Sequence, residues 1–144
     1  MANITGKKET VLRSFPVPTH FKQLLTTIVV NHPDYKNITD FVIQCYETGL
    51  KEILVDLNEL PADEFYIPDP QNHLSNNYAK ELKDFLKKYS IEDLLAEKCE
   101  TVISWNMKES FFLQLKSKVP LSQYKELKVF YFAQVYKGLQ RLVR

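Results

Sequence analysis

Histidine and cysteine side chains are the first candidates for chemistry, because they bind metal ions and serve as bases or nucleophiles in enzymes. The chain carries His20, His32, His73, Cys45 and Cys99. They fall on different expected elements, and their spacing matches no known type of metal site. The sequence also contains no glycine-rich phosphate loop and no signature of a serine nucleophile. We therefore expect no enzyme activity, metal or cofactor, and we expect the histidines at the surface or at helix ends.

The two cysteines lie within amphipathic helical patterns rather than in a disulfide framework. We expect both to be buried, reduced thiols of a cytoplasmic protein. No apolar run approaches the roughly 20 residues that a membrane-spanning helix needs, so no membrane partner is expected.

Charged side chains are distributed unevenly along the chain, although the net charge is only +1. Residues 1–36 carry five positive and two negative side chains, and residues 101–144 carry eight positive and two negative. Residues 37–100 carry six positive and fourteen negative. Basic ends around an acidic middle favour contact with a polyanion, or attraction between the tail and the middle. Simple solvation of helix faces is the remaining interpretation.

Residues 10–17 form the first element that could position contacts with a polyanion. Apolar residues recur there on alternating positions, which predicts a half-buried strand. Val11, Phe15 and Val17 share one face, and Arg13 falls on the same face. This is the only strand that the sequence predicts, and a lone strand leaves its backbone groups unpaired. Pairing with the same strand of a second copy would give a two-stranded ribbon, which fits the major groove of DNA.

Two amphipathic helices are expected after the strand. The first runs from Thr19 to His32 and ends there because a residue before proline, here Pro33, is pushed out of helical geometry. Asn37 is a good N-cap for the second helix, and Asp40 places a favourable acid in its first turn.

The flanking and C-terminal segments complete the expected organisation. Residues 1–9 are expected to be a flexible basic arm, and residues 58–76, which contain three prolines, a linker. Residues 77–144 are expected to form an all-helical domain, with one helix continuing through Ile103 and another beginning at Met107. We see no internal repeat in the sequence.

Residues 10–55 resemble the ribbon-helix-helix family of DNA-binding proteins (the Arc/MetJ type). The resemblance rests on the strand that ends in Val17-Pro18, on a first helix of four turns, and on the opening of the second helix, Asn37-Ile38-Thr39-Asp40. It covers a third of the chain. It implies a mainly α fold, in which residues 10–57 exchange strands between two copies to form an intermolecular antiparallel ribbon, followed by the C-terminal helical domain.

The resemblance also implies the residues that would contact DNA. The outward face of the ribbon would read base edges, and the start of the second helix would lie at the phosphate backbone. Arg13 would reach a guanine if a bulge near Pro16 turned it outward, and Lys7 and Lys8 would be flexible phosphate contacts. The implied DNA-binding residues are Thr10, Leu12, Arg13, Ser14, Lys7, Lys8, Lys36, Asn37, Ile38 and Thr39.

Two functional hypotheses follow. The first is a sequence-specific, homodimeric DNA-binding protein, which acts as a transcriptional repressor or as a plasmid or phage regulator on double-stranded DNA, with higher oligomers on DNA as an extension. The second is a non-enzymatic helical adaptor, of the kind found in partition adaptors or antitoxins, in which residues 77–144 bind a protein partner.

Overall fold

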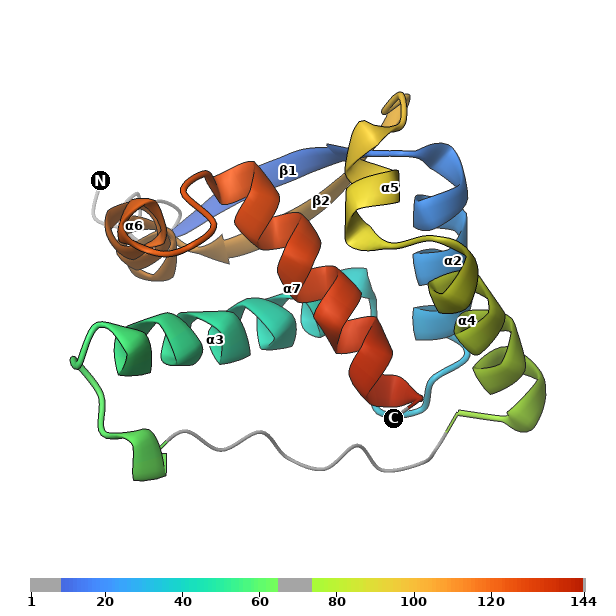
Figure 1. Cartoon of the computed structure of the whole chain (residues 1–144), viewed down its shortest axis with the longest axis horizontal. Helices are drawn as coiled ribbons and strands as arrows, with labels where there is room; N and C mark the ends of the chain where they lie inside the picture. Colours follow the sequence, from blue (N-terminus) through green and yellow to red (C-terminus); the bar gives the residue numbers. More distant parts are fainter. Residues whose placement is uncertain (1–8, 65–73, 144) are drawn as a thin grey trace, which may run out of the picture.

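The chain is mainly helical, with one two-stranded antiparallel sheet (Figure 1). A computed structural model describes residues 9–64 and 74–143. The elements in chain order are β1 (Thr10–Val17), α2 (Thr19–Val30), α3 (Ile38–Asp56), the short 3-10 helix η1 (Ala62–Glu64), α4 (Asn76–Lys88), α5 (Ile91–Ala96), β2 (Thr101–Lys108), α6 (Glu109–Lys118), the 3-10 helix η2 (Val119–Leu121) and α7 (Leu127–Leu142).

β1 pairs with β2 of the same chain over its whole length, from Thr10 opposite Lys108 to Val17 opposite Thr101. The premise that β1 lacks a partner within its own chain is therefore wrong. The physical argument for a second copy, which was an unpaired strand, no longer applies. A ribbon shared between two chains remains a prediction.

Because residues 101–108 form β2, the helix expected through Ile103 ends at Ala96, and the helix expected from Met107 begins at Glu109 as α6. The capping box of α5, in which Ser90 and Asp93 bond to each other's backbone N–H groups, starts the helix as its sequence indicates. The backbone turns to an extended conformation at Glu97, although neither glycine nor proline marks the end. The C-terminal half is consequently not all-helical.

Alternation explains why residues 101–108 prefer a strand once a partner is available. Ile103, Trp105 and Met107 are buried, and the residues between them are exposed. This is the period of two that a strand with one buried face requires. The same apolar residues also extend the preceding helical pattern, and only the presence of β1 decides between the two.

The element order strand–helix–helix occurs twice, first as β1–α2–α3 and then as β2–α6–α7. The first residue of each strand lies opposite the last residue of the other, so the two strands make equivalent contacts with each other. The order of elements thus repeats, although the sequence shows no internal repeat. The second helices of the two units, α3 and α7, pack against each other across the core (Figure 1).

The crossing of α3 and α7 is reciprocal as well. Gly49 of α3 lies against the side chain of Gln134 on α7, and Gly138 of α7 lies against Cys45 on α3. In each helix the glycine follows the contacting side chain by four residues, one helical turn. The two helices therefore approach closely because each presents a glycine to a side chain of the other.

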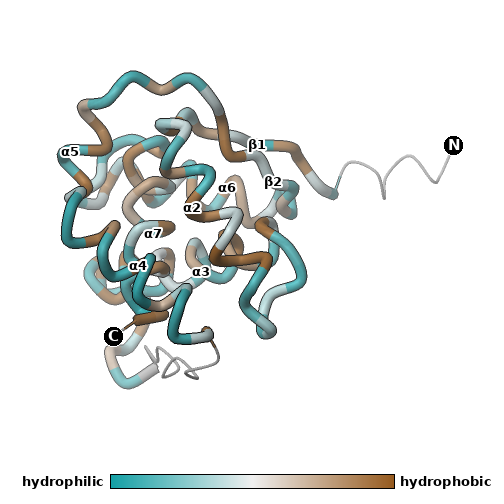
Figure 2. Tube along the Cα trace, turned by 90° about the vertical axis from the view of Figure 1, so that its right-hand side faces the viewer, coloured by the Kyte–Doolittle hydropathy of each residue, from teal (hydrophilic) through white to brown (hydrophobic). Residues whose placement is uncertain are grey.

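Buried side chains from both halves of the chain join in one hydrophobic core. Phe15 of β1 packs edge-on against Trp105 of β2, and Phe21 of α2 stacks on Phe132 of α7. The expected division at residues 58–76 does not separate two cores. By contrast, α4 buries only Leu82 and appears mostly hydrophilic in Figure 2.

Candidate nucleic-acid interface

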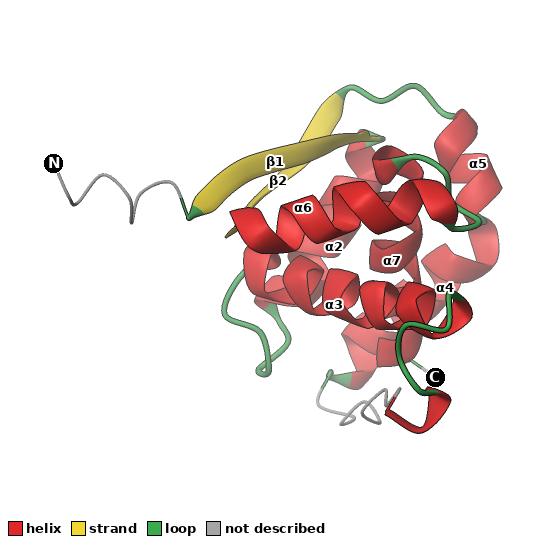
Figure 3. Cartoon of the chain, turned by 90° about the vertical axis from the view of Figure 1, so that its left-hand side faces the viewer, coloured by secondary structure: helices red, strands yellow, loops and turns green. Residues whose placement is uncertain are grey.

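The resemblance assigns to DNA the outer face of a ribbon made from two copies of residues 10–17. The corresponding surface in this structure is the outer face of the ribbon that β1 forms with β2. In Figure 3 the strands lie along one side of the helical body, and none of the helices in the described part of the chain lies on their outer side. Thr10, Leu12 and Ser14 of β1 are exposed there, as predicted for these three residues. The full set of outward residues is Thr10, Leu12, Ser14 and the half-buried Pro16 from β1, with Val102, Ser104, Asn106 and Lys108 from β2.

Pro16 fits the ribbon without breaking its ladder of hydrogen bonds. The N–H of Glu109 donates to the carbonyl of Glu9 at 2.7 Å, just beyond the Thr10–Lys108 pair. Hydrogen-bonded pairs alternate with non-bonded pairs in an antiparallel ladder, so Pro16 falls in a non-bonded pair opposite Val102. A proline there loses no bond to the partner strand, because its nitrogen faces away from it.

Arg13 does not lie on the outer face. The register runs without interruption through all eight pairs, so the bulge near Pro16 that would turn Arg13 outward is absent from β1. The guanidinium lies 4.3 Å from the centre of the Phe112 ring of α6, in a cation–π contact at the edge of the ribbon. Burial raises the pKa of nearby Tyr131 to about 12, with the positive charge of Arg13 acting in the opposite direction.

The start of α3 is shaped as the sequence predicts. The side chain of Asn37 accepts a hydrogen bond from the N–H of Asp40 at 2.8 Å, which makes Asn37 the N-cap. Lys36 and Asn37 are exposed, and Ile38 and Thr39 are half-buried. The carboxylate of Asp40 accepts the Lys36 N–H at 3.1 Å, so this helix start already holds one negative charge.

The start of α7 carries two exposed lysines that sequence reasoning missed. Lys125, Glu126 and Lys128 are exposed, and Glu126 occupies the N-cap position. Lys125 has a positive φ of 66°, a conformation that turns the chain sharply into the helix. Lys36 and Lys125 therefore take the same position in their two units, directly before the N-cap.

The outward residues of β2 were also missed. Ser104, Asn106 and Lys108 carry the hydroxyl, amide and ammonium groups that hydrogen-bond to bases and phosphates. Their signal in the sequence is the alternation of residues 101–108, which was divided between the end of one expected helix at Ile103 and the start of another at Met107. Lys7 and Lys8, which were predicted as phosphate contacts, lie outside the described residues.

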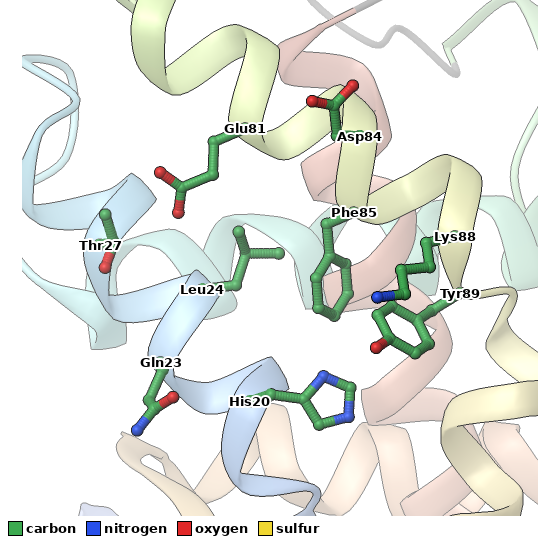
Figure 4. Close-up of a pocket in the computed structure, with 9 residues that line it drawn as sticks. All are labelled: His20, Gln23, Leu24, Thr27, Glu81, Asp84, Phe85, Lys88 and Tyr89. Atoms are coloured by element: carbon green, nitrogen blue, oxygen red, sulfur yellow. The ribbon is translucent and has the colours of Figure 1, made fainter.

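A separate pocket of about 530 Å³ lies between α2 and α4 (Figure 4). Its floor includes Leu24 and an aromatic cluster, in which the His20 ring lies 4.8 Å from Tyr89 and 5.5 Å from Phe85. His20 Nε2 is 2.7 Å from a carboxylate oxygen of Glu97, so its ring is held at the wall of the pocket.

The remaining titratable candidates are structural. His32 lies just after the end of α2, one of its two expected places, but it is buried, and its Nδ1 accepts the Asp34 N–H at 3.1 Å. Burial raises the pKa of the Cys45 thiol to about 12, which keeps it unreactive. Cys99 is exposed, contrary to expectation. Within residues 9–64 and 74–143, no three His, Cys, Asp or Glu side chains converge as a metal site would require.

Comparison of the chain with protein-family models, with curated proteins and with solved structures gives no significant match. Among the described residues, no helix has the length and apolar character to span a membrane.

Proposed function

We propose that this chain is a non-enzymatic protein that binds double-stranded DNA, placing the outer face of its ribbon in the major groove to regulate transcription. The observation that carries the proposal is the exposed face of a two-stranded antiparallel ribbon built by two strand–helix–helix units. The major groove admits such a ribbon, and the resemblance of residues 10–55 assigns this role to the outward residues of β1. Both strands come from one chain, so a single copy supplies the whole reading surface.

The distribution of positive charge supports the proposal. Lys108 is exposed at one end of the outer face, and Lys36 and Lys125 precede the second helix of each unit. Lysines at these places would contact phosphates and fix the position of the ribbon on the duplex. Affinity for any duplex should then fall as salt rises, because bound counterions are released on binding.

Selection of binding sites from random duplexes with the full chain is the primary test. We expect an enriched sequence, and fluorescence anisotropy should show tighter binding to it than to a scrambled duplex. Asn106→Glu adds a carboxylate to the outer face and should weaken binding at least tenfold through repulsion from the phosphates.

Asn77→Glu is the matched control for this charge change. Asn77 is also exposed, but it lies at the start of α4, away from the ribbon (Figure 1). Its affinity should stay within twofold of the unmodified chain. No enriched sequence, together with equal weak binding by both variants, would count against the proposal.

Exposed apolar side chains on the same face favour a second candidate, the protein-binding adaptor. Leu12 is 67% exposed and Val102 is 42% exposed, and both point outward from the ribbon. A partner protein would bury them. In that case duplex DNA gives no anisotropy change, and Leu12→Ser abolishes binding of the partner while Arg13→Ala leaves it intact.

A further inference from the structure

The two ends of the outer ribbon face differ in chemistry. At one end Thr10 lies opposite Lys108, and Leu12 lies opposite Asn106. The other end closes with Pro16 opposite Val102, which has no side-chain hydrogen-bonding group. A ribbon made from two copies of one strand must have identical ends, because a two-fold axis relates them. This ribbon has a polar end and an apolar end.

The polar groups that can distinguish bases come mainly from β2. An asparagine amide can form two hydrogen bonds with adenine, and a lysine can bond to the O6 and N7 atoms of guanine. Asn106 and Lys108 carry these groups, whereas the outward residues of β1 offer two hydroxyls and the side chains of Leu12 and Pro16. Leu12 can contact the methyl group of a thymine but cannot donate a hydrogen bond.

Asn106 and Lys108 are also available for such contacts. Both are exposed, and among the described residues neither side chain is engaged in a hydrogen bond or an ion pair. They belong to neighbouring non-bonded pairs of the ladder, where opposite residues approach most closely. Their side chains therefore point to the same side and lie two residues apart along β2, within reach of adjacent base pairs.

We infer that one copy of the chain recognises a non-palindromic duplex site, in which the end of the ribbon with Asn106 and Lys108 reads bases by hydrogen bonds. The end with Pro16 and Val102 makes only apolar contacts. This inference rests on the proposed function, and it adds the symmetry of the site, the stoichiometry and the reading residues. Proteins that bind as two-fold dimers select palindromes whose half-sites mirror the protein.

The experiment combines site selection with the full chain and native mass spectrometry of the complex on the selected duplex. We expect an asymmetric sequence with one chain per duplex. Asn106→Ala should weaken binding to this site by about 5- to 150-fold, the range expected for the loss of one bidentate base contact. It should also remove the preference at one base position, whereas Asn77→Ala, at the start of α4 and away from the ribbon, should leave affinity and preference unchanged.

The possible failures are distinguishable. A palindromic site bound by two chains would overturn the inference while leaving the proposed function in place. An asymmetric site at which Asn106→Ala and Asn77→Ala have equal, small effects would overturn the assignment of Asn106. No selected sequence and no duplex binding would overturn the proposed function itself. Circular dichroism of each variant ensures that a loss of binding is not a loss of folding.

Discussion

At the scale of single residues, two glycines set the distance between α3 and α7. A Cβ added at Gly138 would collide with the Sγ of Cys45, and one added at Gly49 would lie 2.5 Å from the Cδ of Gln134. The side chains that would have to move are both buried. Glycine at these positions is therefore required by close approach, despite its low helix propensity.

Gly138→Ala should lower the free energy of unfolding by about 1–3 kcal/mol, the usual cost of forcing extra atoms into a packed core. Cys45→Ala removes the colliding sulfur, so the double variant should recover part of this loss. Urea unfolding of the four proteins of this cycle measures the coupling. Strictly additive effects of the two changes would show that Gly138 and Cys45 do not interact.

Two buried tyrosines make the core sensitive to alkaline pH. Burial raises the pKa of Tyr131 to about 12 and that of Tyr46 well above its usual value. Because the folded pKa exceeds the unfolded value near 10, their contribution to stability is full below pH 10. The contribution of Tyr131 is lost as pH rises from 10 towards 12, because the unfolded chain releases the tyrosine proton first.

Tyr131→Phe should reduce this loss of stability between pH 9 and pH 11. At neutral pH it should be neutral or stabilising by up to about 1 kcal/mol, because the buried hydroxyl has no hydrogen-bond partner among the described residues. Urea unfolding at both pH values measures the effect. An unchanged pH dependence would show that Tyr131 titrates alike in the folded and unfolded chains.

At the scale of elements, the caps and turns were the most predictable features. Asn37 caps α3 and Ser90 caps α5, as their local sequences indicate. These interactions involve residues only three positions apart, so no tertiary information is needed to foresee them. Because the cap of α3 depends on Asn37 and Asp40 alone, a substitution at Asn37 can test the proposed phosphate contact without disturbing the rest of the fold.

Asn37→Asp should separate capping from DNA binding. Aspartate is also a good N-cap, so the melting temperature should stay nearly unchanged, whereas the added charge should weaken duplex binding severalfold through repulsion from phosphate. Asn37→Ala should instead lower stability by about 1 kcal/mol, or several degrees in the melting temperature. Equal DNA affinities for the unmodified chain and Asn37→Asp would place the phosphates elsewhere.

At the scale of the whole molecule, one core unites segments far apart in sequence. The single tryptophan, Trp105, is buried against Phe15 of β1, Tyr46 of α3 and Tyr131 of α7. Its environment therefore depends on both strand–helix–helix units at once. Separate unfolding of an N-terminal and a C-terminal domain is not expected from this packing.

Unfolding by urea should give one cooperative transition. The midpoint measured by Trp105 fluorescence should coincide with the midpoint measured by far-ultraviolet circular dichroism, because helices and tryptophan share one core. Two transitions, or a fluorescence midpoint that differs from the helical one, would support independent domains on either side of residues 58–76.

The sequence by itself determined the features that depend on neighbouring residues. The strand over residues 10–17, the two following helices, the cap at Asn37 and the exposure of Thr10, Leu12 and Ser14 all follow from local periodicity and capping. Physical rules that act over one or two turns are sufficient for these.

Only the tertiary structure decided what β1 pairs with and therefore where Arg13, Ser104, Asn106 and Lys108 lie. Residues 101–108 satisfy both a helical and a strand pattern, and the hydrogen bonds offered by β1 favour the strand. That preference comes from a partner more than eighty residues away in the chain, so no local rule could reveal it. The repeated order of elements and the unlike ends of the ribbon become visible only when this pairing is known.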